Sequence, residues 1–335
     1  MSDDKILLSH GGGGVMMKKL IDELIVAKLG NPILAQLGDS AVLELGGRIA
    51  FTSDSFIVKP IFFRGGDIGS LAVCGTANDL AVQGAAPRHI SLSLIIEEGF
   101  ALSDLERVLD SVRAASERAG VSVVTGDTKV VERGAADGLF INTAGVGSIP
   151  EGRNLSVANV QLGDKIIISG YIGDHGIAVL SEREGLEFQT PVESDAAPVV
   201  EVTTAALETS SEIRCMRDPT RGGVSSAVNE MAEASGVGIR LFEEQIPVRE
   251  SVRAACDMLG FDPLSVANEG KVVIVCGAAD AEAVLAAVRK TELGRDASIA
   301  GEAVADHTGK VSMHTAAGGI RMVDVPYGEQ LPRIC

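Results

Sequence analysis

Hydrophobic residues recur at two spacings along the chain, and segments of the two kinds alternate. Apolar residues at every third or fourth position predict helices, and short β-branched runs bounded by turn residues predict strands. The predicted helices cover residues 15–29, 103–119, 196–208, 223–234 and 280–291. The predicted strands cover residues 41–45, 48–52, 89–96, 121–125, 139–146, 165–169 and 271–276. This mixture indicates an α/β or α+β protein.

Turn signals set the predicted limits of the helices. Gly30-Asn31-Pro32 stops the first helix. Ser103 and Glu106 fit a capping box at the start of the second, and Gly120 fits its C-cap.

A turn-rich stretch, SIPEGRN at 148–154, separates two comparable halves. We therefore expect a glycine-rich segment and helix at 1–35, an N-terminal domain at 36–152 and a C-terminal α+β domain at 153–318. Residues 319–335 contain two prolines and no long periodic segment, which predicts a flexible tail ending in Cys335. The apolar runs 41–45 and 48–52 predict a hairpin that needs pairing or cover.

Composition excludes several classes of protein. With 335 residues, 46% of them hydrophobic, the chain can bury a sizeable core. Its five cysteines form no CxxC pair, which favours reduced thiols in the cytoplasm. The acidic N-terminus and the lack of an 18-residue apolar run predict neither secretion nor a membrane span. A formal net charge of −17 opposes nonspecific binding to nucleic acid.

Four aspartates lie at strand ends or in short turns, each with glycine or asparagine nearby: Asp54, Asp79, Asp127 and Asp218. Any one of them alone fits a turn or a helix cap better than a metal site. Together they suit a hard divalent cation, because Mg²⁺ prefers oxygen ligands and glycines let a triphosphate approach the backbone. The pattern therefore predicts a nucleotide site with Mg²⁺.

Other candidates have two interpretations each. The run HGGGG at 10–14 is neither a Walker loop nor a Rossmann fingerprint, and it is either a flexible hinge or a phosphate-covering loop. Lys129 is a strand-end charge or a functional group, and Glu269 is a turn residue or a functional one. Cys335 is a chance terminal cysteine or a carrier thiol, but it is not a prenylation box.

A series of motifs resembles the hydrogenase maturation family HypE. They are SHGGGG, TSDS, GTANDLAVQGA, VTGDTKVV, ISGYIGDHG, RDPTRGGV, ANEGK and the terminal PRIC. HypE belongs to the superfamily of aminoimidazole ribonucleotide synthetase, selenophosphate synthetase and thiamine-monophosphate kinase. The resemblance implies a two-domain α+β fold like that of the first of these enzymes, with a mobile C-terminal tail. It also implies a homodimer formed through the N-terminal strands.

The resemblance implies a specific reaction. In HypE the carbamoyltransferase HypF places a carbamoyl group on the C-terminal cysteine, and ATP is used to dehydrate the resulting thiocarbamate to a thiocyanate. The cyano group then passes to the iron that HypC and HypD carry for [NiFe]-hydrogenase. Two alternatives remain: another ATP-dependent synthetase or kinase of the superfamily, and a noncatalytic scaffold that binds partners through its tail.

The resemblance also assigns roles to residues. Asp54, Asp79 and Asp127 are expected to hold Mg²⁺, and Lys129, Glu269 and Cys335 are expected to be catalytic. Lys129 would neutralise the transferred phosphoryl group, and Glu269 would remove the nitrogen proton. The residues expected to contact the nucleotide, apart from the metal ligands, are His10, Gly11, Gly12, Gly13, Asn78, Thr125, Gly126, Thr128, Asn142, Asp218 and Arg221.

Overall fold

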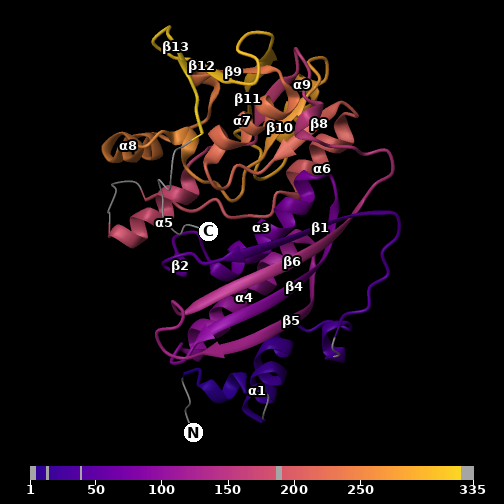
Figure 1. Ribbon diagram of the computed structural model, residues 1–335, viewed down its shortest axis with the longest axis vertical. Coiled ribbons are helices and arrows are strands. Elements are labelled where there is room, and N and C mark those ends of the chain that lie inside the picture. The colour runs from indigo at the N-terminus through magenta and orange to yellow at the C-terminus, as the bar shows by residue number, and fades with distance from the viewer. Residues whose placement is uncertain (1–4, 13–14, 38–39, 186–190, 326–335) are drawn as a thin grey trace.

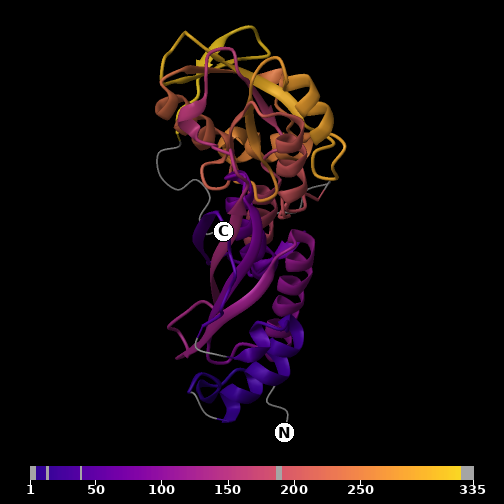
Figure 2. The ribbon, with the colours of Figure 1, turned by 90° about the vertical axis from the view of Figure 1, so that its right-hand side faces the viewer.

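The chain folds into two halves stacked along the long axis of the molecule (Figures 1 and 2). This arrangement is seen in a computed structural model, which describes residues 5–12, 15–37, 40–185 and 191–325. The N-terminal elements occupy one end and the C-terminal elements the other. Each half is built around its own sheet, so the predicted two-domain α+β architecture is confirmed.

The N-terminal half contains a four-stranded sheet in the order β1-β6-β4-β5. Its strands are β1 (Arg48–Phe56), β4 (Ala86–Glu97), β5 (Ser122–Val131) and β6 (Leu139–Ile149). Strands β4 and β5 are parallel and are joined by a helix, whereas the other pairs are antiparallel. A small hairpin of β2 (Phe62–Phe63) and β3 (Gly66–Asp67) precedes the first long helix.

Two helices, α3 (Ile68–Val82) and α4 (Leu102–Ala119), pack on one face of this sheet. Helix α3 is buried on nearly all sides, as expected for a helix with apolar residues around its whole circumference. Most of its side chains join the N-terminal core, but Ala81 and Val82 join a core cluster of the other half. Helix α3 therefore packs into the cores of both halves.

The N-terminal segment is helical from residue 15 to residue 29, as predicted. It consists of α1 (Val15–Leu20), a π-helical stretch at Ile21–Val26 and α2 (Ala27–Leu29). The helix stops where the sequence predicted. Beyond it, the Asn31 side chain donates a hydrogen bond of 2.7 Å to the Val123 carbonyl and ties the segment to β5.

The C-terminal half contains a seven-stranded sheet in the order β13-β12-β9-β11-β7-β10-β8. Its strands are β7 (Lys165–Ile168), β8 (Ile213–Arg217), β9 (Gly238–Phe242), β10 (Val273–Cys276), β11 (Ser298–Val304), β12 (Val311–His314) and β13 (Ile320–Met322). The helices are α5 (Asp174–Glu184), α6 (Val200–Thr209), α7 (Gly223–Ser235), α8 (Glu250–Leu259) and α9 (Ala281–Val288). Helices α6 and α9 cover one face and α7 the other, which is why KIII in β7 is apolar at consecutive positions.

Three sequence predictions need correction. Residues 41–46 form no strand, so the hairpin of 41–45 with 48–52 is wrong: among the described residues β1 pairs with β6 alone. Helix α4 begins after Ala101, whose side chain makes no cap, so Ser103 lies inside the helix rather than capping it. The predicted flexible tail begins too early, because β13 pairs with β12 and Val323 is buried. Gly120 does close α4 in the left-handed conformation, as predicted.

Candidate active site

Four carboxylates from different elements meet where α3 faces the C-terminal half. Asp54 comes from β1, Asp79 from α3, Asp218 from the loop after β8, and Glu269 from the loop before β10. The Thr52 hydroxyl donates a hydrogen bond of 2.7 Å to Asp79 Oδ2. This acidic cluster combines residues from the predicted motifs TSDS, GTANDLAVQGA, RDPTRGGV and ANEGK.

Gly75 allows β1 to approach α3 at this point. A Cβ atom at Gly75 would lie 2.9 Å from the Phe56 ring and 3.8 Å from Asp54 Oδ2. Any side chain would therefore push the strand away from the helix. The small residue explains how the carboxylate of Asp54 comes close to Asp79 on the next turn of α3.

The carboxylates of the cluster repel one another. Burial raises the pKa of Asp54, and the negative charge of Asp79 raises it further, while the Ser55 amide and Arg221 lower it. Burial, followed by the charge of Asp79, raises the pKa of Asp218 to about 6. Such a cluster is stabilised by a cation, and Mg²⁺ usually binds one or two carboxylates together with nucleotide phosphates. The donor set therefore fits a magnesium nucleotide.

Glu269 is the most deeply buried carboxyl group of the cluster. It is 2% exposed, and its Oε1 atom has no hydrogen-bond partner among the described residues. Burial raises its pKa well above the ordinary value, and the charge of Asp218 adds to the shift. A buried carboxyl group with a raised pKa and a free oxygen has the properties of an acid or base catalyst.

Neighbouring residues of ANEGK hold Glu269 in place. Asn268 accepts a hydrogen bond from the Gly173 amide at 2.7 Å and donates one of 2.9 Å to the Pro219 carbonyl. A Cβ atom at Gly270 would lie 1.9 Å from the Asp195 carbonyl oxygen, so only glycine fits. The motifs ISGYIGDHG, RDPTRGGV and ANEGK are thus joined around one buried asparagine.

Arg221 and Asn78 differ in how they relate to the cluster. Arg221 lies close enough to lower the pKa of Asp54, and it precedes two glycines with positive φ, Gly222 and Gly223.

Asn78 is 1% exposed, and its side-chain amide is hydrogen-bonded to backbone groups of the other half. It donates to the carbonyls of Ala197 and Glu269 and accepts from the Val199 amide. Asn78 therefore joins the two halves, and its contact with the nucleotide stays a prediction. Its bond to Val199 also accounts for α6 beginning at Val200, four residues later than predicted.

A second group of predicted site residues lies on β5. Asp127 and Lys129 are both largely exposed, and Lys129 Nζ lies 2.8 Å from Asp127. The hydrogen bond from Lys129, followed by one from the Thr128 amide, lowers the pKa of Asp127. A register shift between β4 and β5 occurs at Ile90/Ser91, and a Cβ atom at Gly126 would lie 2.0 Å from the Leu92 carbonyl oxygen. The bulge and the glycine fix the path of the strand here.

The structure does not bring Asp127 together with Asp54 and Asp79 within one chain. Three strand spacings separate β5 from β1, or about 14 Å, and the alternation of side chains places Asp54 and Asp127 on opposite faces of the sheet. Among the described residues, no group of three or more His, Cys, Asp or Glu side chains is arranged to hold a metal ion. The assignment of each aspartate to Mg²⁺ stays a prediction.

Asn142 lies between these two groups of residues. Its side-chain nitrogen donates to the Asp54 carbonyl at 2.8 Å and to the Ser55 hydroxyl at 2.9 Å. In the register of the sheet it shares a row with Asp127 and Ser55. Asn142 therefore fixes the path of β1 at Asp54 and Ser55.

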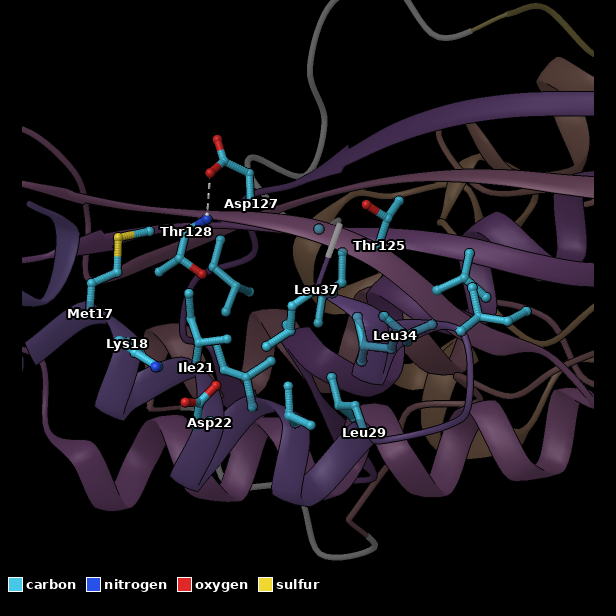
Figure 3. Close-up of a pocket in the computed structure, with 18 of the residues that line it drawn as sticks. Met17, Lys18, Ile21, Asp22, Leu29, Leu34, Leu37, Thr125, Asp127 and Thr128 are labelled. Carbon is cyan, nitrogen blue, oxygen red and sulfur yellow. Dashed lines mark hydrogen bonds between the residues drawn. The ribbon is translucent and has the colours of Figure 1, made fainter. Parts of the chain in front are cut away.

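A pocket of about 500 Å³ opens beside the predicted phosphate-contact segment (Figure 3). Thr125, Gly126, Asp127 and Thr128 form one wall, and apolar residues of the N-terminal helical segment, including Met17 and Ile21, form another. Its volume lies in the range of small-molecule sites. The motifs do not predict this apolar wall, although the helical spacing of hydrophobic residues between 15 and 29 is a signal for it.

The glycine-rich start packs against the same strand. His10 is buried, and its Nδ1 atom accepts a hydrogen bond of 3.0 Å from the Leu7 amide, so that nitrogen stabilises the local turn. A Cβ atom at Gly11 would lie 2.7 Å from the Val130 amide nitrogen. Gly12 follows, while Gly13 and Cys335 lie outside the described residues. This position beside β5 favours the phosphate-covering interpretation of the glycines over a free hinge.

Comparison with known proteins assigns the family. The family described as AIR synthase related protein matches with its N-terminal domain at residues 37–149 and its C-terminal domain at 161–314. The carbamoyl dehydratase HypE of Azotobacter vinelandii is 52% identical over 336 residues, covering 100% of this chain and 98% of the relative. That of Escherichia coli K12 is 45% identical, covering 99% and 100%. The chain belongs to the HypE family.

Solved structures agree with this assignment. A HypE crystal structure in complex with ATP superposes with a TM-score of 0.95 at 46% identity, covering 98% of this chain and 99% of that one. A HypE–HypF complex gives a TM-score of 0.81 at 46% identity, with 92% and 99% covered. Thiamine-monophosphate kinase of Stenotrophomonas maltophilia gives 0.66 at 19% identity, with 92% and 96% covered, which shows a shared fold alone.

Proposed function

We propose that this HypE-family protein uses ATP to dehydrate an S-carbamoyl group on its own Cys335 to a thiocyanate. The observation that carries the proposal is Glu269, a buried carboxyl group of the acidic cluster whose Oε1 atom has no hydrogen-bond partner among the described residues. The reaction must remove protons from an amide nitrogen, and such a carboxyl group can take them in a site closed to water. The ATP complex of a relative at 46% identity supports the nucleotide.

The chemistry divides into two steps. The amide oxygen is a poor leaving group, so its attack on the γ-phosphorus of ATP, with loss of one nitrogen proton, converts it into a phosphate ester and releases ADP. Loss of phosphate together with a nitrogen proton then forms the carbon–nitrogen triple bond. Lys129 would offset charge on the phosphoryl group after exchanging its contact with Asp127 for the nucleotide.

Magnesium would bind together with the nucleotide. Asp54 and Asp79 would hold it at the acidic cluster, whereas Asp127, about 14 Å away on the opposite face of the sheet, would reach the same nucleotide only from a second chain. The bound ion supplies charge neutralisation at the phosphates. Asp218 and Arg221, on the loop facing Asp54, would position the nucleotide or the entering cysteine.

The path of the cysteine is limited by the last anchored residue. The Val323 amide donates to the Val311 carbonyl at 2.9 Å, and Asn229 donates to the Val323 carbonyl at 2.9 Å. Residues 324–335 can therefore extend at most about 40 Å from this anchor. An arm that began at Arg321 could reach roughly 50 Å, so the anchoring of Val323 shortens the reach of the cysteine.

The proposed partners follow from the same account. HypF would carbamoylate Cys335, as the HypE–HypF complex of a relative suggests, and a HypC–HypD complex would receive the cyano group. The four described cysteines are free and buried, which is consistent with the proposed location in a reducing cytoplasm. Within the described residues, no helix combines the length and apolar character needed to span a membrane.

Carbon-13-labelled carbamoyl phosphate tests the proposed reaction. With HypF and ATP, the label is expected in a protein-bound nitrile that NMR detects. With HypF and a nonhydrolysable ATP analogue, it is expected to remain a thiocarbamate. A label that never leaves the carbamoyl form in the presence of ATP would refute the dehydration.

Asp79→Ala is expected to abolish ATP turnover by the carbamoylated protein. The substitution removes a proposed Mg²⁺ ligand and its charge neutralisation, whereas a cluster of mutually repelling carboxylates contributes little to stability. Asp127→Ala is expected to act in the same direction. Release of ADP and the melting temperature are the measurements, with Asp306→Ala, an exposed aspartate paired with Arg240, as the control. Unchanged turnover in both variants would return these residues to structural roles.

We propose that the protein forms a homodimer through the face of the N-terminal sheet that α3 and α4 leave open. Ile49 and Phe51 are 51% and 69% exposed on β1, whose outer edge is also unpaired within the described chain. A contiguous apolar surface and a free edge strand favour association.

Phe51→Asp is therefore expected to convert the dimer into a monomer, because it places a charge in the proposed interface. Leu162→Asp alters a similarly exposed apolar residue, 61% exposed, of the other half and is expected to leave the dimer intact. Light scattering at micromolar concentration measures the mass. A monomeric wild-type protein would contradict the proposal.

A further inference from the structure

The main chain of Glu269 is held by a buried side chain on each side of its Cα atom. The Glu269 amide donates a hydrogen bond of 3.1 Å to Asp195 Oδ1. The Glu269 carbonyl accepts one of 2.9 Å from the side-chain nitrogen of Asn78, a residue that is 1% exposed. The two bonds together fix the point from which the carboxyl side chain leaves the main chain.

The segment that precedes α6 joins these two partners. The Asn78 side-chain nitrogen also donates 3.1 Å to the Ala197 carbonyl, and its oxygen accepts 2.8 Å from the Val199 amide. Both N–H groups of the Asn78 amide are therefore used by main-chain carbonyls. With the short stretch of chain from Asp195 to Ala197, the bonds to Glu269 close a ring. The ring crosses the boundary between the halves, because only Asn78 belongs to the N-terminal one.

The residues after Glu269 pack tightly against the same segment. A Cβ atom at Gly270 would lie 1.9 Å from the Asp195 carbonyl oxygen and 3.2 Å from the Ala197 amide nitrogen. Lys271 Nζ lies 3.1 Å from Asp195 Oδ2, and the two side chains of this pair are 8% and 5% exposed. The main chain at 269–271 therefore has little freedom to shift relative to 195–197.

Helix α3 connects this ring to the acidic cluster. Asn78 directly precedes Asp79, whose Oδ2 atom accepts a hydrogen bond of 2.7 Å from Thr52 on β1. The helix is buried on nearly all sides, so neighbouring residues of one turn keep a fixed relation to each other. The positions of Glu269 and of the proposed metal ligand Asp79 are thus both set from the same turn of α3.

The proposed reaction depends on such a fixed relation. The carbamoyl oxygen must meet the γ-phosphate while the carbamoyl nitrogen, two bonds away, meets the base. A misplacement of about 1 Å in a reacting group can lower a rate about 10²-fold. A base carried on a loop therefore needs an anchor that also defines the nucleotide site.

We propose that Asn78 is a positioning residue for nitrile formation, which fixes the main chain of Glu269 from the helix that carries Asp79. Asn78 acts through Glu269 rather than on the substrate, so the inference rests on the proposed function. Loss of the Asn78 amide is expected to impair removal of the nitrogen protons and to leave binding of MgATP in place. It is expected to matter little in a protein whose Glu269 carboxylate is already absent.

Asn78→Ala in the full chain, carbamoylated by HypF, tests the inference in a single turnover at saturating MgATP. Nitrile formation is expected to fall about tenfold or more, while the dissociation constant of MgATP stays within about threefold of wild type. Asn78→Asp is the second variant, and it carries the test if the alanine variant does not fold. It keeps the size of the side chain and an acceptor for the Val199 amide but loses the donor to Glu269, so the same fall is expected.

Asp164→Ala is the matched control for loss of a buried hydrogen-bonding side chain. Asp164 is 4% exposed and accepts a hydrogen bond of 2.8 Å from the Gln161 amide. It precedes the Lys165 end of β7, which pairs with Cys276, whereas the other end pairs with Val273 nearer to Glu269. This variant is expected to lower the melting temperature and to leave single-turnover nitrile formation within about twofold of wild type.

A double-mutant cycle separates positioning from general damage. Asn78→Ala is also made in the Glu269→Gln background, where it is expected to lower the remaining nitrile formation by less than about twofold. Damage to the fold or to nucleotide binding acts independently of the base, so it would lower the rate by the same factor in both backgrounds.

Each other outcome overturns the inference. A wild-type rate of nitrile formation in the folded Asn78 variants would show that the contact with Glu269 is dispensable. Equal losses in the two backgrounds would assign Asn78 to the fold, and a tenfold weaker binding of MgATP would assign it to the nucleotide. A wild-type rate in Glu269→Gln would remove the base through which Asn78 acts. A wild-type protein that forms no nitrile would refute the proposed function itself, and the inference with it.

Discussion

Replacing Cys335 with alanine is expected to abolish acceptance of the carbamoyl group and all thiocyanate formation. The sulfur is the proposed attachment point, so no other side chain can substitute for it. Folding and binding of MgATP are expected to be unchanged, because the residue follows the last anchored position, Val323, by twelve residues and the acidic cluster is built without it.

Radiolabelled carbamoyl phosphate with HypF measures the acceptance, and a nucleotide titration with and without Mg²⁺ measures the binding. Cys335→Ser is the stricter variant, since it replaces the thiol with a hydroxyl group of similar size that is a much weaker nucleophile. Labelling of either variant at the wild-type level would place the acceptor elsewhere in the chain.

Replacing Glu269 with glutamine is expected to lower nitrile formation by about 10²–10⁴-fold, the usual contribution of a general base. The substitution is nearly isosteric, so binding of ATP is expected to persist. Single-turnover measurement of nitrile formation at saturating ATP is the test. A loss smaller than about tenfold would show that another group removes the nitrogen protons.

The same substitution is expected to raise the melting temperature at about pH 8. The pKa of Glu269 is raised in the folded protein, so ionising it opposes folding. The stability of the wild type therefore falls as the pH rises from the unfolded pKa through the folded one, whereas the glutamine variant lacks this loss. Equal melting temperatures at about pH 5 and pH 8 in both proteins would contradict the electrostatic account of the site.

Local sequence patterns predict a helix or strand correctly where its side chains pack against other elements of the same half. The helix at 15–29 and the strands KIII and HISLSLII were predicted because their side chains pack against adjacent elements of the chain. The run at 41–45 has the same apolar character but no partner strand in the described chain, and a sequence pattern cannot show whether a partner exists. The tail prediction failed at β13 because pairing with β12 stabilises three residues that have no periodicity of their own.

The site could be predicted by residue type but not by arrangement. The motifs identified the aspartates and Glu269, since carboxylates near glycines suit nucleotide chemistry. They did not show that the Asn78 side chain is hydrogen-bonded to the backbone of the other half, or that Asp127 lies on the opposite face of the sheet from Asp54. Both facts depend on contacts between residues far apart in sequence.

The mass of the C-terminal peptide tests the central claim most directly. The full chain is first incubated with HypF, carbamoyl phosphate and a nonhydrolysable ATP analogue, and the isolated protein is then divided between a second incubation with MgATP and one without nucleotide. We predict that the peptide ending in Cys335 gains the mass of a carbamoyl group, and that supplying MgATP then removes the mass of one water. A carbamoylated peptide whose mass is unchanged by MgATP, or a cyano group found on any other residue, would contradict the account.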